Sequence, residues 1–184
     1  MKFILASKSP RRKKILKKMN LNFKIIESNI DESVLTINMN PYRYSIELAE
    51  LKAKNISIKN PNYTVIGADT IVSINKQILN KPKDFKEAKA MLDLLNGNIH
   101  EVITGVSLKN KSLNINESFY DVSFVSFYKL TNNEIINYIN NYKPFDKAGS
   151  YGIQGYAGLF IKDIKGSYDN IVGFPISKFY QIIK

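Results

Sequence analysis

Hydrophobic positions along the chain follow two different spacings, one typical of strands and the other of helices. Short apolar or β-branched runs predict strands at residues 3–6, 23–26, 64–74, 102–108 and 119–127, and two short strands on either side of Gly166. Apolar stripes behind cap residues predict helices that begin near Ser9, Pro41, Asp84, Thr131 and Pro175. The two types alternate without a repeat or linker, so we expect a single α/β domain over residues 1–184 with a mixed sheet flanked by helices.

The first predicted helix begins directly after the first predicted strand. Ser9 suits the N-cap and Pro10 the first helical position, and Ile15, Leu16 and Met19 then fall on one face. Asp84 with Glu87 forms a capping box for a later helix, and Thr131 with Glu134 caps another.

The strand predicted at residues 64–74 contains the sequence Gly67-Ala68-Asp69-Thr70 in its middle. A carboxylate inside a buried strand is costly unless it is paired or does chemistry. Asp69 is therefore a hydrogen-bonded structural residue, a metal ligand or a general base, and the strand alone leaves all three open.

The chain is strongly basic. Its 27 Lys and Arg residues outnumber 16 Asp and Glu residues, for a formal net charge of +11, which favours polyanions or phosphorylated small molecules as partners. Many lysines are explained equally well as drift on a solvated surface in a chain rich in Lys, Asn and Ile. Arginine occurs only at Arg11, Arg12 and Arg43, so the adjacent pair near the N-terminus indicates a need for the guanidinium group.

Cysteine is absent and His100 is the one histidine, which excludes disulfides, thiolate catalysis and cysteine-based or multi-histidine metal sites. His100 by itself is typical of a partly buried histidine with a satisfied partner. No apolar run approaches the roughly 18 residues that cross a bilayer, and the run at residues 3–6 is too short for a signal peptide. We expect a soluble cytoplasmic protein.

Two segments have the composition of ligand-binding loops. Ser7, Ser9, Arg11 and Arg12 surround a predicted helix N-terminus, where backbone N–H groups attract anions, and so predict a phosphate cradle. The alternative is that Ser9 only caps the helix and the arginines are solvated. The glycine-rich segment 146–155 contains Gln154, whose amide can both donate to and accept from a nucleobase edge.

Three further sets gain meaning only together. Asp31-Glu32 in a polar loop, Lys52 on the second predicted helix and Lys81 before Pro82 are each ordinary surface residues when taken alone.

In their order along the chain these motifs resemble the Maf family of nucleoside triphosphate pyrophosphatases, over essentially the whole sequence. The matching stretches are residues 5–12, 52–54, 66–70, 81–82, 102–105, 146–155 and 172–175. With Gln154, the chain resembles the branch of the family that acts on dTTP and UTP. The 7-methyl-GTP branch has Glu at that position. Ser150 and Phe174 depart from the usual Ala and Leu.

The resemblance implies an ITPase-like fold with two lobes around a substrate cleft. It implies that the protein is a nucleoside triphosphate diphosphatase, which hydrolyses dTTP and UTP to the monophosphate and pyrophosphate. Modified pyrimidine nucleotides are further candidate substrates. By the family pattern, Asp69 accepts the proton of the attacking water, and Arg11, Thr70 and Gln154 set substrate choice. The remaining roles are phosphate binding by Ser7, Ser9, Arg11, Arg12, Lys52 and Lys81, and binding of Mg²⁺ or Mn²⁺ by Glu32 and Asp69.

The resemblance also implies a house-cleaning role, a link to arrest of cell division, and a homodimer. The alternative function is a nucleic-acid-binding or septation-regulating protein that uses the basic N-terminal helix. Because such a protein needs neither a carboxylate within a strand nor the Gln154 loop, we expect the enzyme.

Overall fold

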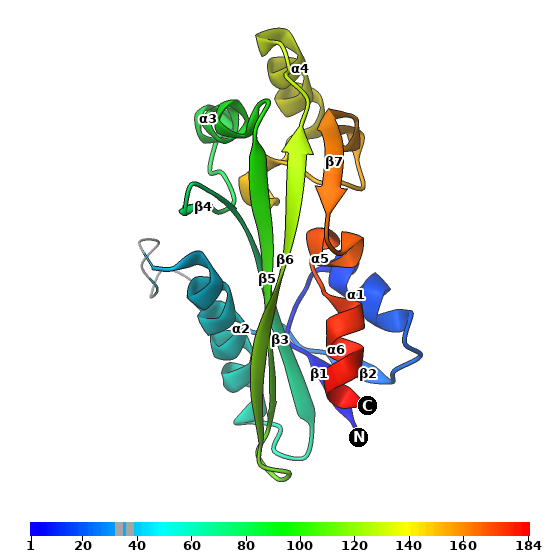
Figure 1. Ribbon diagram of the computed structural model, residues 1–184. Helices are drawn as coiled ribbons and strands as arrows, with labels where there is room; N and C mark the ends of the chain where they lie inside the picture. Colours follow the sequence, from blue (N-terminus) through cyan, green and yellow to red (C-terminus); the bar gives the residue numbers. More distant parts are fainter. Residues whose placement is uncertain (32–34, 36–38) are drawn as a thin grey trace.

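The computed structural model describes residues 1–31, 35 and 39–184, and its centre is a mixed seven-stranded sheet (Figure 1). The strand order is β2 (Phe23–Ile25), β1 (Phe3–Leu5), β3 (Thr64–Ile74), β5 (Ile99–Asn110), β6 (Ile115–Phe127) and β7 (Ile161–Lys165), and β4 (Gln77–Leu79) pairs with β3. β1 runs parallel to β2 and β3, and the other pairs are antiparallel. The predicted mixed sheet is confirmed.

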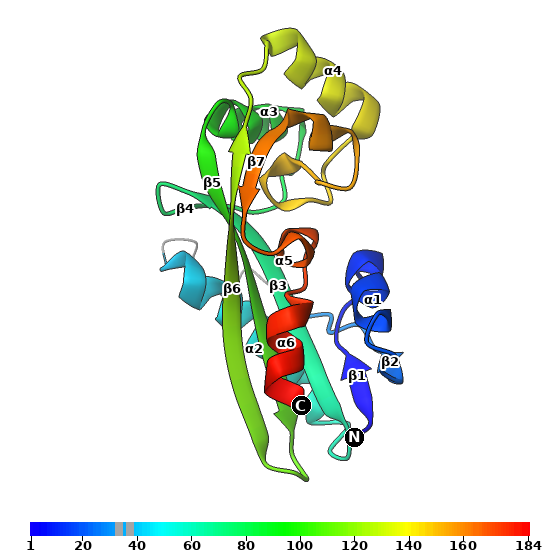
Figure 2. The same cartoon turned by 45° about the vertical axis from the view of Figure 1, so that its right-hand side comes forward.

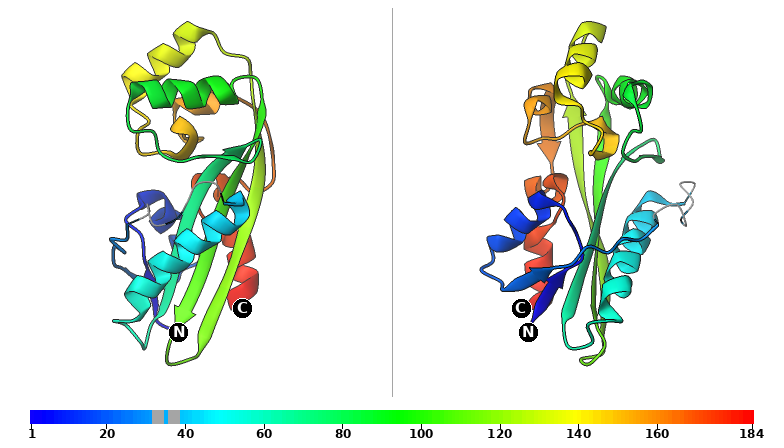
Figure 3. Two further views of the ribbon diagram at one scale, coloured as in Figure 1. Left: turned by 90° about the vertical axis from the view of Figure 1, so that its left-hand side faces the viewer. Right: turned by 180° about the vertical axis from the view of Figure 1, so that it is seen from behind.

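Helices cover both faces of this sheet. They are α1 (Pro10–Lys17), α2 (Pro41–Ser57), α3 (Phe85–Leu95), α4 (Asn132–Tyr142), α5 (Tyr168–Val172) and α6 (Ile176–Ile183), with the 3₁₀ turns η2 (Ala148–Ser150) and η3 (Tyr156–Phe160). α2 lies along one face of β3 and β5, and α1 and α6 lie on the other side (Figure 3). α3, α4 and β7 gather at the far end of the long strands (Figure 2).

Two large apolar cores divide the molecule into two lobes. In the larger lobe, Leu5 and Leu16 pack with Ile66 and the C-terminal Phe174 and Phe179. In the smaller lobe, the core is formed by α3, α4 and the ends of β5 and β6 around Phe127. β3, β5 and β6 run through both lobes, and the two-lobed form is the one that the resemblance implied.

The helix α2 approaches the sheet at two strand glycines. A Cβ atom on Gly67 would lie 2.1 Å from the carbonyl oxygen of Ala49, and one on Gly105 would lie 2.2 Å from that of Ser45. Gly105 is paired with Asp69 across β3 and β5. The absence of two side chains therefore brings the backbone of α2 down onto the strand that carries Asp69.

Most predicted elements are confirmed, often with longer strands than the pattern indicated. The Ser9 and Thr131 caps form as expected, the latter as a complete capping box. At α3 the Asp84 half forms, but the Glu87 carboxylate accepts from the backbone of Lys83 rather than from Asp84.

The prediction of two short strands around Gly166 is wrong in its second half. β7 precedes this glycine, but the helix α5 follows it. The Ser167 hydroxyl accepts from the backbone N–H of Asn170 at 3.2 Å and so caps a helix in an apolar run that resembles a strand. The short strand β4, which follows a turn at Asn75 and Lys76, was not predicted.

Among the described residues, no helix combines the length and the apolar character needed to span a membrane.

Candidate functional site

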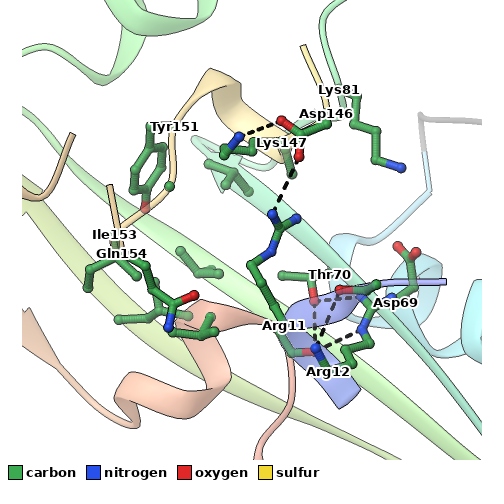
Figure 4. A pocket seen from close by; sticks show the side chains of 18 of the residues that line it. Arg11, Arg12, Asp69, Thr70, Lys81, Asp146, Lys147, Tyr151, Ile153 and Gln154 are labelled. Carbon is green, nitrogen blue, oxygen red and sulfur yellow. Dashed lines mark hydrogen bonds and ion pairs between the residues drawn. The ribbon is translucent and has the colours of Figure 1, made fainter. Parts of the chain in front are cut away.

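A pocket of about 550 Å³ lies between the two lobes, beside the carboxyl end of β1 (Figure 4). β1 ends at Leu5, opposite Ile66, whereas its parallel neighbour β3 continues for eight more residues to Ile74. This leaves Asp69 and Thr70 on a stretch of β3 with no β1 residue beside it. Ligand sites of α/β proteins commonly form where strands end in this way.

The start of α1 forms one wall of the pocket. The Ser9 side chain accepts from the backbone N–H of Arg12 at 3.4 Å, and the Ser7 hydroxyl accepts from the backbone N–H of Ser9 at 3.2 Å. Pro10 occupies the first helical position. The helix N-terminus with its partial positive charge therefore lies beside the pocket, as the phosphate-cradle prediction requires.

Arg12 is held by the protein itself. Its guanidinium donates to the carbonyl oxygen of Gly173 at 2.9 Å, to the Thr70 hydroxyl at 3.0 Å and to the Ser7 hydroxyl at 3.3 Å. Arg12 therefore ties α1 to β3 and to the segment after α5, and presents a fixed positive charge to the pocket.

Arg11 has a different arrangement. Its guanidinium reaches across the cleft to the carboxylate of Asp146 at 3.4 Å, and Asp146 also pairs with the neighbouring Lys147. Partial burial raises the pKa of Asp146, but the hydrogen bonds and charges of Lys147 and Arg11 outweigh this effect and hold it below its ordinary value. The Arg11–Asp146 pair joins the two lobes at the pocket.

The buried centre of the pocket is an ion pair. Lys52 of α2 donates to the Oδ1 atom of Asp69 at 2.5 Å, and only 11% and 12% of the two side chains are exposed. Such a pair needs a close approach of helix and strand, which the contacts at Gly67 and Gly105 provide. The carboxylate of Asp69 thus has a fixed orientation at the pocket surface.

Thr70 belongs to a chain of hydrogen bonds that crosses the sheet. Its hydroxyl lies 3.0 Å from that of Thr104 on β5, and Thr104 donates to the backbone carbonyl of Asn170 at 3.1 Å. Together with the bond from Arg12, these contacts fix the rotamer of Thr70 in the wall of the pocket.

The glycine-rich segment after α4 forms the opposite wall. Gly149 has a φ of +64° and packs against Val72, and its N–H donates to the carbonyl of Asn80 at 3.2 Å. Gln154 and Tyr151 line the pocket, on the side away from Asp69 and Lys81 in Figure 4.

The structure brings the predicted site residues together. The pocket is lined by Ser9, Arg11, Arg12, Lys52, Asp69, Thr70, Lys81 and Gln154. Ser7 lines an adjoining hollow of about 180 Å³ that shares Ser9, Arg12, Lys52 and Lys81 with the first. Glu32 lies outside the described residues.

Several lining residues were not singled out from the sequence. They are Lys8, Asp146, Lys147 and Tyr151 in the pocket and Glu27 in the adjoining hollow. All but Glu27 fall within the stretches that carry the family resemblance, so their position in those stretches was the available signal. Basic side chains outnumber carboxylates in both spaces, which suits an anionic ligand.

The donor set of the pocket suits a hard cation only with help from a ligand. Within residues 1–31, 35 and 39–184, no group of three or more His, Cys, Asp or Glu side chains is gathered to hold a metal ion. Asp69 offers carboxylate oxygen at the pocket surface. One carboxylate fits Mg²⁺ or Mn²⁺, because these ions take many of their ligands from phosphate oxygens and water.

Comparison with known proteins finds matches over nearly the whole chain. The family model described as Maf-like protein matches residues 2–184. A dTTP/UTP pyrophosphatase of Carboxydothermus hydrogenoformans is 44% identical over 184 residues, which cover 100% of this chain and 98% of the relative. A dTTP/UTP pyrophosphatase of Bacillus pumilus is 46% identical over 181 residues, covering 98% and 94%.

A solved structure of a nucleoside-triphosphatase, or dITP/XTP pyrophosphatase, from Mycobacterium abscessus shows a looser likeness. Its TM-score is 0.45 at 11% identity, over 69% of this chain and 74% of that chain.

Proposed function

The chain belongs to the Maf family, and we propose that it hydrolyses nucleoside triphosphates, preferring dTTP and UTP, to the monophosphate and pyrophosphate. The names of the full-length relatives support the substrate. The observation that carries the reaction type is the Lys52–Asp69 pair, a fixed carboxylate in a pocket that is otherwise rich in basic side chains.

The positive charges around the pocket suit the binding of a triphosphate. A triphosphate carries close to four negative charges, and Arg11, Lys52 and Lys81 lie where they can neutralise them. The fixed guanidinium of Arg12 and the N-terminus of α1 add preorganised positive charge. Charge that develops on the pyrophosphate leaving group is stabilised by the same groups.

Asp69 is the candidate proton acceptor. In the proposed step a water oxygen forms a bond to the α-phosphorus, and the bond from that phosphorus to the bridging oxygen breaks, so that pyrophosphate leaves with the electron pair. The proton of the water passes to the carboxylate of Asp69, whose orientation Lys52 fixes.

Gln154 supports the pyrimidine preference. Uracil and thymine present an N–H donor between two carbonyl acceptors, and a carboxamide can pair with the donor and one acceptor at once. Thr70 and Arg11, the other two predicted specificity residues, line the same pocket.

A divalent cation is part of this proposal. Asp69, with Glu32 as its predicted partner, would hold Mg²⁺ or Mn²⁺ together with substrate phosphates. When bound, the cation lowers the pKa of the attacking water and neutralises phosphate charge. Chelation with EDTA is expected to abolish turnover, and either cation is expected to restore it.

The test is a panel of canonical and modified nucleoside triphosphates with identification of both products. We expect pyrophosphate and the monophosphate from dTTP and UTP. Asp69→Asn is expected to lower kcat by about 100-fold to 10,000-fold, the range of a lost general base. Asp163→Asn, on the exposed strand β7, is the matched control and should behave as the unaltered chain. Release of orthophosphate, or full activity in Asp69→Asn, would contradict the proposal.

Three further expectations stay predictions: the homodimer, the cytoplasmic location and the link to cell division. A nucleotide-binding site that also served nucleic acid would bind DNA with strong salt dependence. We expect no such binding.

A further inference from the structure

His100 is a polar residue in the apolar core of the smaller lobe. It lies on β5, only 2% of it is exposed, and its Nε2 atom is 2.7 Å from the hydroxyl of Tyr151. The ring of Phe127 contacts both rings edge-on, with centroids 5.0 Å and 4.9 Å away. In the part of the chain that the structure describes, Nδ1 of His100 has no hydrogen-bond partner.

This arrangement lowers the stability of the fold, which suggests that it is kept for a function. A buried polar ring without a full set of partners destabilises the fold, and two phenylalanines could occupy a similar volume at no such cost. Two phenylalanines would lack the directional hydrogen bond that holds the hydroxyl of Tyr151 at one position.

Tyr151 belongs to the wall that carries Gln154. It lines the pocket three residues before Gln154. The hydroxyl of Tyr151, held by His100, thus anchors the first residue of the segment 151–154 in the core of the smaller lobe.

His100 cannot act on the substrate directly. It is buried and is not among the residues that line the pocket. Burial also lowers the pKa of His100 to about 4, so its ring is neutral at physiological pH. Its influence on the site must pass through Tyr151.

We propose that His100 is a positioning residue for nucleobase recognition: its hydrogen bond to Tyr151 holds the segment 151–154 so that Gln154 faces the base. This inference rests on the proposed function. The phosphate side of the pocket lies on α1, α2 and β3, so the loss of His100 should alter base recognition and leave the hydrolytic step largely intact.

The experiment measures kcat and KM for UTP and CTP in His100→Phe, Tyr151→Phe and the double variant. Each single variant is expected to raise KM for UTP about fivefold to tenfold, the value of one hydrogen bond, with kcat within about twofold. The preference for UTP over CTP should fall by a similar factor. The double variant should be no worse than either single one, because both remove the same bond.

Two more variants separate positioning from stability. His100→Gln retains a polar group that can reach Tyr151 and is expected to restore most of the preference. Ile135→Val, on α4 in the same core, loosens the packing without removing the hydrogen bond, and should lower Tm while leaving KM and preference unchanged. Should His100→Phe not fold, His100→Gln and Tyr151→Phe carry the comparison.

The inference is overturned if His100→Phe and Tyr151→Phe both keep the unaltered KM and preference and differ only in Tm. If the unaltered chain releases no pyrophosphate from any nucleotide, the proposed function itself fails, which is a distinct result.

Discussion

The Nζ atom of Lys52 lies 2.5 Å from the Oδ1 atom of Asp69, and this pair joins α2 to β3, which brings the Asp69 carboxylate to the pocket. Both side chains are largely buried. Breaking a buried pair by removing one partner costs about 3 to 5 kcal/mol, because the other charge is left uncompensated.

Lys52→Met is therefore expected to lower the free energy of unfolding by about 3 kcal/mol and to lower activity, since the orientation of Asp69 is lost. Adding Asp69→Asn to this variant should restore part of the stability but none of the activity. Urea unfolding and pyrophosphate release measure the two effects. Lys54→Met, an exposed lysine on the same helix, is the control, and equal losses in both lysine variants would refute the role of the pair.

The close packing of α2 against β3 predicts the effect of a single methyl group. A Cβ atom on Gly67 would lie 2.1 Å from the carbonyl of Ala49, so Gly67→Ala must push the helix away from the strand. We expect a loss of about 3 kcal/mol in stability from this overpacking, and reduced turnover because Lys52 moves with the helix. Gly155→Ala, where the nearest atom is 3.7 Å away, should keep its stability in the same thermal unfolding measurement.

The Arg11–Asp146 pair predicts competition at the pocket. A bound triphosphate must take Arg11 from Asp146, so Asp146→Asn is expected to lower KM for UTP. The effect should be only about twofold to fivefold, because 63% of the Asp146 side chain is exposed and solvent screens the pair. In an Arg11→Gln background the same change should have no effect on KM. A rise in KM for Asp146→Asn alone would show that Asp146 assists binding instead.

Burial of His100 predicts a loss of stability in acid. Its pKa falls from 6.5 to about 4 on folding, so the unfolded chain binds more protons than the folded one between these values. The free energy of unfolding should therefore be fully retained above pH 6.5 and decrease by about 3 kcal/mol as the pH falls to 4. Urea unfolding at several pH values tests this. His100→Phe should lack that part of the pH dependence, and parallel curves for the two proteins would contradict the prediction.

Local patterns were sufficient for most of the elements. Ser9 followed by Pro10, and Thr131 followed by Glu134, satisfy the N–H groups of a helix within one turn, so neighbouring residues decide those starts. The prediction of a strand after Gly166 was wrong because Ile171 and Val172 are buried by packing on other elements. This packing overrides the strand-like composition of the segment.

For the site, the sequence by itself determined which chemical groups are present: two arginines at a helix start, a carboxylate within a strand, and a glycine-rich segment with Gln154. Their order along the chain also indicated the family to which the protein belongs. The sequence left three roles open for Asp69: a structural residue, a metal ligand or a base. Lys52 and Asp69 are 17 residues apart and belong to different elements, so the sequence does not fix their distance in space.

The tertiary structure decided which of these groups face one another. The early end of β1 and the approach of α2 over Gly67 and Gly105 bring Lys52 to Asp69. It also separated the two arginines, since Arg12 is bound by Ser7, Thr70 and Gly173 whereas Arg11 reaches across the cleft. Contacts between distant segments depend on how the whole sheet packs, and no local pattern records them.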